Sequence, residues 1–137
     1  MGAWGTGNFD NDTANDWAAD FVDAGDLSFV RDVLEKVAAT TTEEYLRERI
    51  SCHALAACEV IARLKGNWGT RDSYSEKVDD WVQANRTEPS RDLVQLAWRA
   101  IDRIVTAPSE LMELWDERRK GPEWHATVEE LRERIAR

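Results

Sequence analysis

Apolar side chains recur at three- and four-residue intervals along almost the whole chain after residue 11, which is the spacing of one helix face. No stretch alternates apolar and polar residues in the way that a half-buried strand does. The clearest stripe is formed by Leu93, Val94, Ala97, Trp98, Ile101, Ile104 and Val105. The pattern therefore predicts an all-α fold of six or seven helices. With 137 residues, 42% of them hydrophobic, the chain can build one core, so we expect a single helical domain over residues 1–137.

Capping residues and helix breakers predict where these helices begin and end. Gly25 suits the left-handed position that follows a helix, so the first helix is expected to cover 12–24. Thr41 and Glu44 have the spacing of a capping box, which predicts that the longest helix begins there. Further boundaries are predicted at Asp26, Gly66, Ser73, Ser90, Ser109, Gly121 and Thr127.

Two segments of the chain, 64 residues apart, have several identical residues at matching positions. At this shift Trp4-Gly5-Thr6 aligns with Trp68-Gly69-Thr70, and Asp16-Trp17 aligns with Asp80-Trp81. One interpretation is a duplicated three-helix unit, in which helices one to three would superpose on helices four to six. The other is coincidence in a chain that contains seven tryptophans.

Charge restricts the classes of partner. Against 18 Lys and Arg stand 27 Asp and Glu, so the net charge is −9, which repels nucleic acid and anionic lipid. We therefore expect neither a nucleic-acid nor a membrane partner. No apolar run reaches the roughly 20 residues of a membrane helix, and the first residues lack the pattern of a signal peptide, so a cytoplasmic location is expected.

The first predicted helix carries an acidic face. Asp12, Asp16, Asp20 and Asp23 step by four, four and three residues and so lie on one side of the helix, opposite Trp17 and Phe21. Like charges at this spacing repel one another, and the last two also lie at the helix end that disfavours anions. Three explanations are open: pairing with basic residues of 118–120 or 132–137, simple solvation, or recognition of a basic partner protein.

The segment before this helix contains Trp4, Phe9 and Asp10 together with three glycines. Glycine permits close approach of the backbone, so we expect this coil to dock on the helices with Trp4 mostly buried. If Trp4 is exposed, it joins Phe9 and Asp10 as a candidate binding residue. Trp17, Trp81, Trp98 and Trp115 fall on apolar helix faces and are expected in the core, whereas Trp4, Trp68 and Trp124 are expected in connections.

No residue set meets the standard of an active site or a cofactor site. Cys52, His53 and Cys58 point in different directions on a helix and cannot converge on one ion, so no metal site is predicted from them, and the two thiols are expected to be free. No cofactor motif and no catalytic motif is present. The remaining enzymatic alternative is a small enzyme or divalent-metal-binding protein that uses Asp10, Asp12 and Asp16.

Residues 1–26, MGAWGTGNFDNDTANDWAADFVDAGD, resemble the opening of an uncharacterised bacterial family of domains of unknown function, whose members begin M-G-x-W-G-T-G-x-F-D-N-D. The C-terminal part, with Glu113-Leu114-Trp115-Asp116-Glu117 and Trp124, is similar to the same family. The resemblance implies a compact cytoplasmic protein and supplies no catalytic residues. Our interpretation is a non-enzymatic protein-protein interaction module, of which an immunity-like protein that neutralises a basic toxin is one version. A homo-oligomer that acts within a larger assembly is a third alternative, because the sequence leaves the oligomeric state open.

Overall fold

A computed structural model describes residues 2–137, so Met1, the first residue of the N-terminal motif, lies outside the described part. Seven helices follow one another: α1 (Asp12–Ala24), α2 (Ser28–Ala39), α3 (Glu48–Leu64), α4 (Glu76–Ala84), α5 (Arg91–Ile104), α6 (Glu110–Glu117) and α7 (Gly121–Ala136). Within residues 2–137 the only β-type pairings are two isolated bridges, and there is no strand. The predicted all-α fold of six or seven helices is confirmed.

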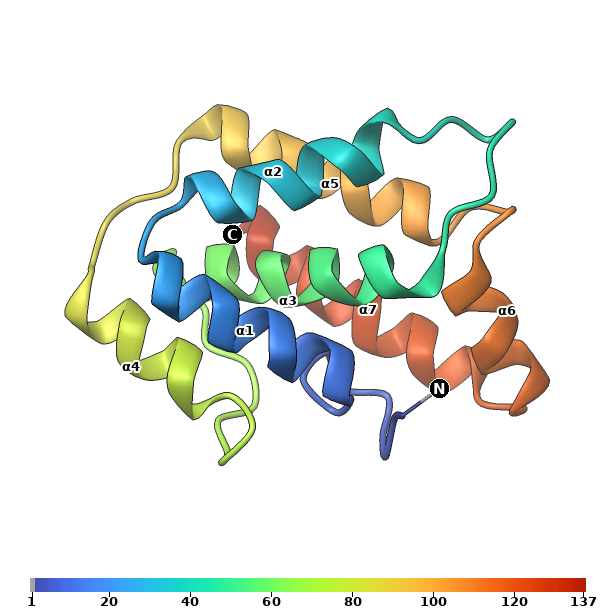
Figure 1. The fold of residues 1–137 in the computed structure, drawn as a ribbon, viewed down its shortest axis with the longest axis horizontal. Coiled ribbons are helices and arrows are strands. Elements are labelled where there is room, and N and C mark those ends of the chain that lie inside the picture. Colours follow the sequence, from blue (N-terminus) through green and yellow to red (C-terminus); the bar gives the residue numbers. More distant parts are fainter. Residues whose placement is uncertain (1) are drawn as a thin grey trace.

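Helix α3 lies at the centre of the bundle and contacts each of the other six helices. Figure 1 shows α2 and α5 running side by side along one edge, with α4 and α6 at opposite ends. From Ser51 to Leu64 every side chain of α3 except His53 is buried. Four alanines in this segment leave room for neighbouring helices to approach closely: Ala54, Ala56, Ala57 and Ala62.

The boundaries of α1 agree with the sequence prediction, and caps explain them. The side chain of Asn11 accepts a hydrogen bond from the backbone N–H of Ala14 (2.7 Å), which satisfies a free donor of the first turn. Gly25 ends the helix in the left-handed region (φ 72°), and its N–H donates to the carbonyl of Phe21. The predicted cap of α5 is also confirmed, since Ser90 Oγ accepts from the N–H of Leu93.

The prediction that the longest helix begins at the Thr41–Glu44 capping box was wrong, because α3 begins at Glu48. The buried guanidinium of Arg103, on α5, holds the preceding segment as a loop. It donates to backbone carbonyls of Thr40 (2.7 Å), Thr41 (3.3 Å), Glu44 (2.8 Å), Thr106 (2.7 Å) and Pro108 (3.0 Å). The N-terminus of α3 is capped by the Glu110 carboxylate, which accepts from the Glu48 N–H at 2.8 Å.

The last helix begins earlier than the sequence indicated. Helix α7 starts at Gly121 with Pro122 in its first turn, so Thr127 lies within it instead of capping it. Trp124 is consequently a helical core residue, 1% exposed, and not a residue of a connection.

The two halves of the chain do not pack alike, which argues against the duplication. Helix α3 packs on both α1 and α2, whereas the corresponding α6 packs on α3 and α7 within the described residues. None of the helices between residues 2 and 137 combines the length and the apolar character that crossing a bilayer requires.

Candidate functional site

Residues 2–11, here called the N-terminal loop, form a closed turn that returns to its starting point beside α1. The N–H of Trp4 donates to the carbonyl of Asp10 (2.9 Å), and the N–H of Asp12 donates to the carbonyl of Gly2 (3.1 Å). A tighter turn closes between the Asp10 N–H and the Gly7 carbonyl (3.0 Å). These bonds fix the backbone path of the loop.

The carboxylate of Asp10 fills the middle of the loop and explains two of its glycines. Its Oδ2 accepts a hydrogen bond from the Gly7 N–H at 3.1 Å. A Cβ at Gly5 would lie 2.6 Å from this oxygen, and a Cβ at Gly7 would lie 2.5 Å from it. Both distances are far below a normal contact, so these positions need glycine for close approach.

The two aromatic residues of the loop differ in burial. Phe9 is 6% exposed and packs in the core beneath the guanidinium of Arg63, 5.4 Å from the ring centroid. Trp4 is 48% exposed, so the expectation that it is mostly buried was wrong. Its ring lies against Tyr74, which is itself 45% exposed, with the centroids 4.8 Å apart. The loop is therefore docked through Phe9, while Trp4 and Tyr74 form an exposed aromatic pair.

Beneath the loop lies a buried charge network made of Asn8, Glu59, Arg63, Asp79 and Arg134. Glu59 of α3 is its centre, because Arg134 of α7 binds both carboxylate oxygens, each at 2.8 Å. Asn8 donates to the same carboxylate (2.7 Å), and so does Arg63, one helical turn away. Such bidentate, charge-assisted pairing is the strong form of an ion pair.

Asp79 of α4 completes the network on its other side. Arg63 Nε donates to Asp79 Oδ1 at 2.7 Å, and Arg63 Nη2 donates to the carbonyl of Thr70 at 2.6 Å. Ser75 Oγ donates to the second oxygen of Asp79 at 2.7 Å. Two buried carboxylates thus balance two buried guanidiniums.

The arginines determine the ionisation of Glu59. Burial by itself would raise the pKa of this carboxyl, but the hydrogen bonds and charges of Arg134 and Arg63 outweigh burial and hold the pKa below its usual value. Burial would likewise lower the pKa of Arg134, and Glu59 with Glu130 raises it instead. Glu59 and Arg134 are therefore both charged at neutral pH.

A small cavity of about 120 Å³ opens between the N-terminal loop, α3, α7 and the connection from α3 to α4. Asn8, Asp10, Glu59, Arg63, Glu130 and Arg134 are among the residues that line it. The N-terminal loop and the buried charges therefore meet at this cavity.

The acidic face of α1, formed by Asp12, Asp16, Asp20 and Asp23, lies elsewhere. All four side chains are exposed, and within residues 2–137 none of them takes part in an ion pair. Arg132 and Arg134, named above as candidate internal partners, instead pair with Asp102, Glu129, Glu59 and Glu130.

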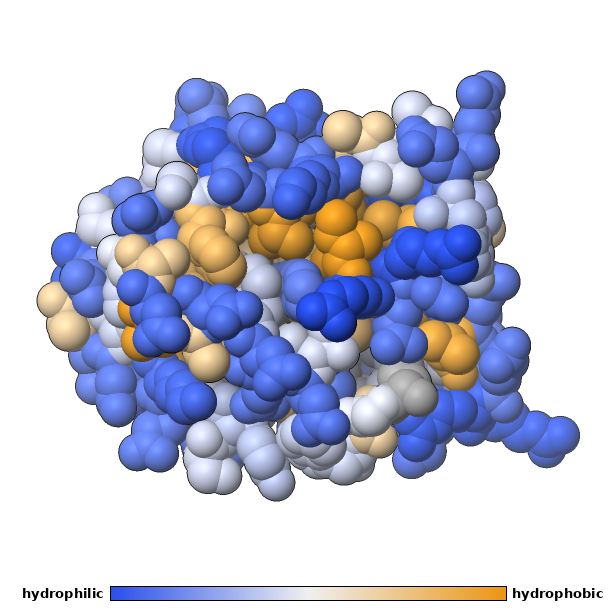
Figure 2. All heavy atoms as spheres, viewed as in Figure 1, coloured by the Kyte–Doolittle hydropathy of each residue, from blue (hydrophilic) through white to orange (hydrophobic). Residues whose placement is uncertain are grey.

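An apolar groove of about 590 Å³ runs beside the acidic face, between α1, α2 and α3. Figure 2 shows it as an apolar band between α1 and α2. Trp17, Phe29, Val33 and Ile50 contribute its apolar lining, and Asp20 and Asp32 contribute carboxylates from α1 and α2. Lys36, Arg47, Arg49 and His53 supply basic groups to the same groove.

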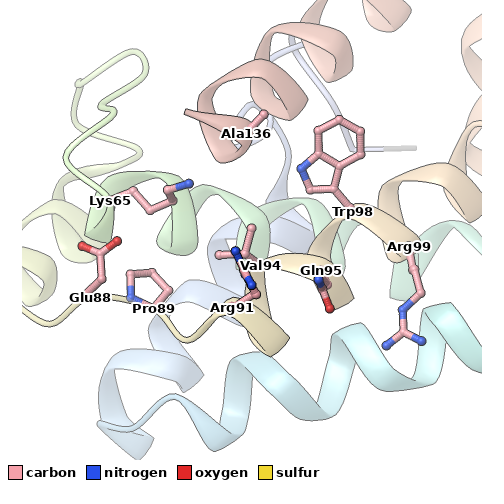
Figure 3. Close-up of a pocket in the computed structure, with 9 residues that line it drawn as sticks. All are labelled: Lys65, Glu88, Pro89, Arg91, Val94, Gln95, Trp98, Arg99 and Ala136. Carbon is pink, nitrogen blue, oxygen red and sulfur yellow. The ribbon is translucent and has the colours of Figure 1, made fainter.

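A second, larger groove of about 880 Å³ follows α5. Figure 3 shows its lining along α5, with Lys65 at the end of α3 and Ala136 at the end of α7. Trp98 forms part of this lining and is only partly buried, with Arg132 over its ring at 5.0 Å. Trp81 is also partly buried, whereas Trp17 and Trp115 are core residues as predicted.

Cys52 and Cys58 are free and buried, and burial raises the pKa of the Cys52 thiol to about 12. His53 is half-buried, and burial together with Arg49 lowers its pKa. Between residues 2 and 137, no three His, Cys, Asp or Glu side chains converge closely enough to hold a metal ion.

The sequence interpretation named Asp10 and Phe9 but missed Glu59, Arg63 and Asp79, and it considered Arg134 only as a partner for the aspartates of α1. A signal for two of them exists, because Glu59 and Arg63 are the only Asp, Glu, Lys or Arg residues between Ser51 and Leu64. A helix segment without a polar face must be buried, and its few charges must then find partners.

Comparison with known families matches residues 2–127 to the domain of unknown function DUF4259. The match spans most of the chain, so the chain belongs to this family. No curated protein and no solved structure matches it.

Proposed function

We propose that this member of the DUF4259 family is a non-enzymatic binding protein whose acidic α1 face recognises a basic partner protein. One observation carries the proposal: four carboxylates are aligned and exposed on α1, and none is ion-paired within residues 2–137. Their mutual repulsion costs a few tenths of a kcal/mol per pair, and a cationic partner would remove it.

The neighbouring groove supports the same surface. Phe29 and Ile50 are partly exposed and offer apolar contact area in the groove that Asp20 also lines. The rim of this groove is of mixed charge, because Asp32 lies on it together with the basic groups described above. A binding surface of this kind has an apolar centre for affinity and a charged rim that steers the encounter. A basic toxin that the chain neutralises is one partner with the required chemistry.

The other residues predicted to contact a partner, Trp4, Phe9 and Asp10, differ in their exposure to solvent. Trp4 is available to a partner, and Asp12 lines a shallow hollow together with Trp4 and Arg118. Phe9 is a core residue and takes no part in the proposed surface. Asp10 is partly exposed and belongs to the N-terminal loop.

The test replaces three carboxylates in the variant Asp16→Asn, Asp20→Asn, Asp23→Asn. A matched control, Glu43→Gln, Glu88→Gln, Glu133→Gln, removes the same net charge from exposed, unpaired residues outside α1. A partner captured from the native cell is purified, and its association rate is measured at several salt concentrations. We expect association with the α1 variant to be slower by on the order of tenfold at low salt and less salt-dependent, with the control unchanged.

The melting temperature of the same proteins separates the rival explanations. The proposal expects the α1 variant to be as stable as the wild type or slightly more stable, because repulsion is removed. Lower stability would show that the aspartates pair internally. A metal site would appear as a rise in melting temperature with divalent ions in the wild type alone. Unchanged association kinetics would also refute the proposal.

A further inference from the structure

We propose that the cavity beneath the N-terminal loop binds one organic cation, the ammonium or guanidinium end of a small molecule or of a side chain from another protein. The cavity has a volume of about 120 Å³ and is walled by the N-terminal loop, α3 and α7. Its lining does not include the four aspartates of the acidic face. The inference therefore goes beyond the proposed function and does not depend on it.

An oxygen of Asn8 without a hydrogen-bond partner indicates that the ligand donates hydrogen bonds. Asn8 is 7% exposed, and its Nδ2 donates to Glu59 Oε2 at 2.7 Å. Its Oδ1 is buried and accepts no hydrogen bond from any group in residues 2–137. Turning the amide over would bring this oxygen against the Glu59 carboxylate, where two acceptors repel, so the orientation is fixed. A buried acceptor of this kind needs a donor.

The charges around the cavity indicate that the donor is a cation. Four carboxylates line the cavity, those of Asp10, Glu59, Asp72 and Glu130, against the two guanidiniums of Arg63 and Arg134. Every guanidinium nitrogen of these arginines already donates to a group of the protein. The lining thus keeps unfilled acceptors and an excess of negative charge, which favours a cation over an anion.

Size and surroundings favour an organic cation over a metal ion. The lining carboxylates do not converge into a three-ligand metal cluster within the described residues. A volume of about 120 Å³ equals that of about four water molecules and accommodates a charged head group with a short stem.

The experiment titrates the folded protein with ethylammonium or ethylguanidinium at constant ionic strength, with sodium as the reference ion. Nuclear magnetic resonance follows the side-chain amide of Asn8 and the backbone amide of Gly7. We expect saturable shifts in the wild type. Asn8→Ala and Asp10→Asn should each weaken affinity about tenfold, as expected when one charge-assisted bond is lost. The control Glu133→Gln, an exposed carboxylate of α7 outside the cavity lining, should bind like the wild type.

Blocked tripeptides with a central Lys or Arg distinguish the two sources of the cation. Tighter binding of a tripeptide than of the free amine identifies a protein side chain, and the reverse identifies a small molecule; both support the site. Absence of saturable shifts, or equal affinity in the wild type and Asp10→Asn, would show that the cavity holds water only and overturn the proposal. If Asn8→Ala does not fold, the affinity of Asp10→Asn relative to the wild type still tests the proposal. The Asp16, Asp20 and Asp23 variant should bind the probe normally, so failure of one proposal leaves the other standing.

Discussion

Replacing Glu59 with Gln removes the central negative charge of the buried network while it preserves the size of the side chain. Glu59 is 5% exposed and receives hydrogen bonds from Arg63, Arg134 and Asn8. After the change, Arg63 keeps Asp79 as a charged partner, but the only charged partner left to Arg134 among the described residues is the half-exposed carboxylate of Glu130. Loss of one partner from a buried pair costs about 3 to 5 kcal/mol. We therefore expect Glu59→Gln to lower the free energy of unfolding by about that amount.

Urea denaturation followed by circular dichroism measures this change. With an m-value of about 2 kcal/mol/M, the midpoint should fall by roughly 2 M. The control Glu133→Gln changes an exposed, unpaired carboxylate and should alter stability by less than about 0.5 kcal/mol. A loss below about 1 kcal/mol for Glu59→Gln would refute the reasoning.

Two further measurements identify the cause of the loss. The double variant with Arg134→Met should be less destabilised than the sum of the single variants, because the uncompensated cation is then absent. Acid should weaken the same interaction. The pKa of Glu59 is lower in the folded than in the unfolded protein, so ionised Glu59 stabilises the fold above about pH 4.3. This stabilisation is lost as the pH falls through the folded-state pKa. Glu59→Gln should lack this part of the acid transition.

Three other predictions concern the N-terminal loop and α3. Gly7→Ala should destabilise the fold by about 1 to 3 kcal/mol in urea denaturation, because the new Cβ would lie 2.5 Å from Asp10 Oδ2. Phe9→Ala should cost about 3 to 5 kcal/mol and Trp4→Ala less than about 1 kcal/mol, since only Phe9 is buried; equal losses would contradict the docking described above. His53 should titrate below 6.5 by nuclear magnetic resonance, and the stability that its neutral form provides above that pH should decline as the pH falls through the lowered pKa.

Local signals were sufficient for α1 and α5. In α1 the apolar spacing, the first-turn acid Asp12 and the left-handed Gly25 all agree, and each acts within a few residues of the helix it defines. In α5 the cap Ser90 bonds to a residue three positions away. Boundaries that depend on neighbours in the sequence can be predicted from the sequence.

The beginning of α3 depends instead on residues far away. Thr41 and Glu44 have the spacing of a helix cap, but Arg103 binds their carbonyls from α5, about sixty positions later in the chain. Glu110 supplies the actual cap for Glu48. Local spacing carries no information about these contacts, so the capping-box prediction failed where tertiary hydrogen bonds replace helical ones.

The buried charge network could be predicted from the sequence only in part. Opposite charges four residues apart, as in Glu59 and Arg63, usually mark a solvated helix surface. Here the rest of the segment from Ser51 to Leu64 is apolar apart from Ser51 and His53, so the helix has no continuous polar face to turn to water. The pair must therefore be buried with further partners. The sequence can thus show that partners are needed, but Arg134 and Asp79 are two among many charged residues of the chain. Only the packing of α7 and α4 on α3 selects them, and with them the cavity that Asn8 closes.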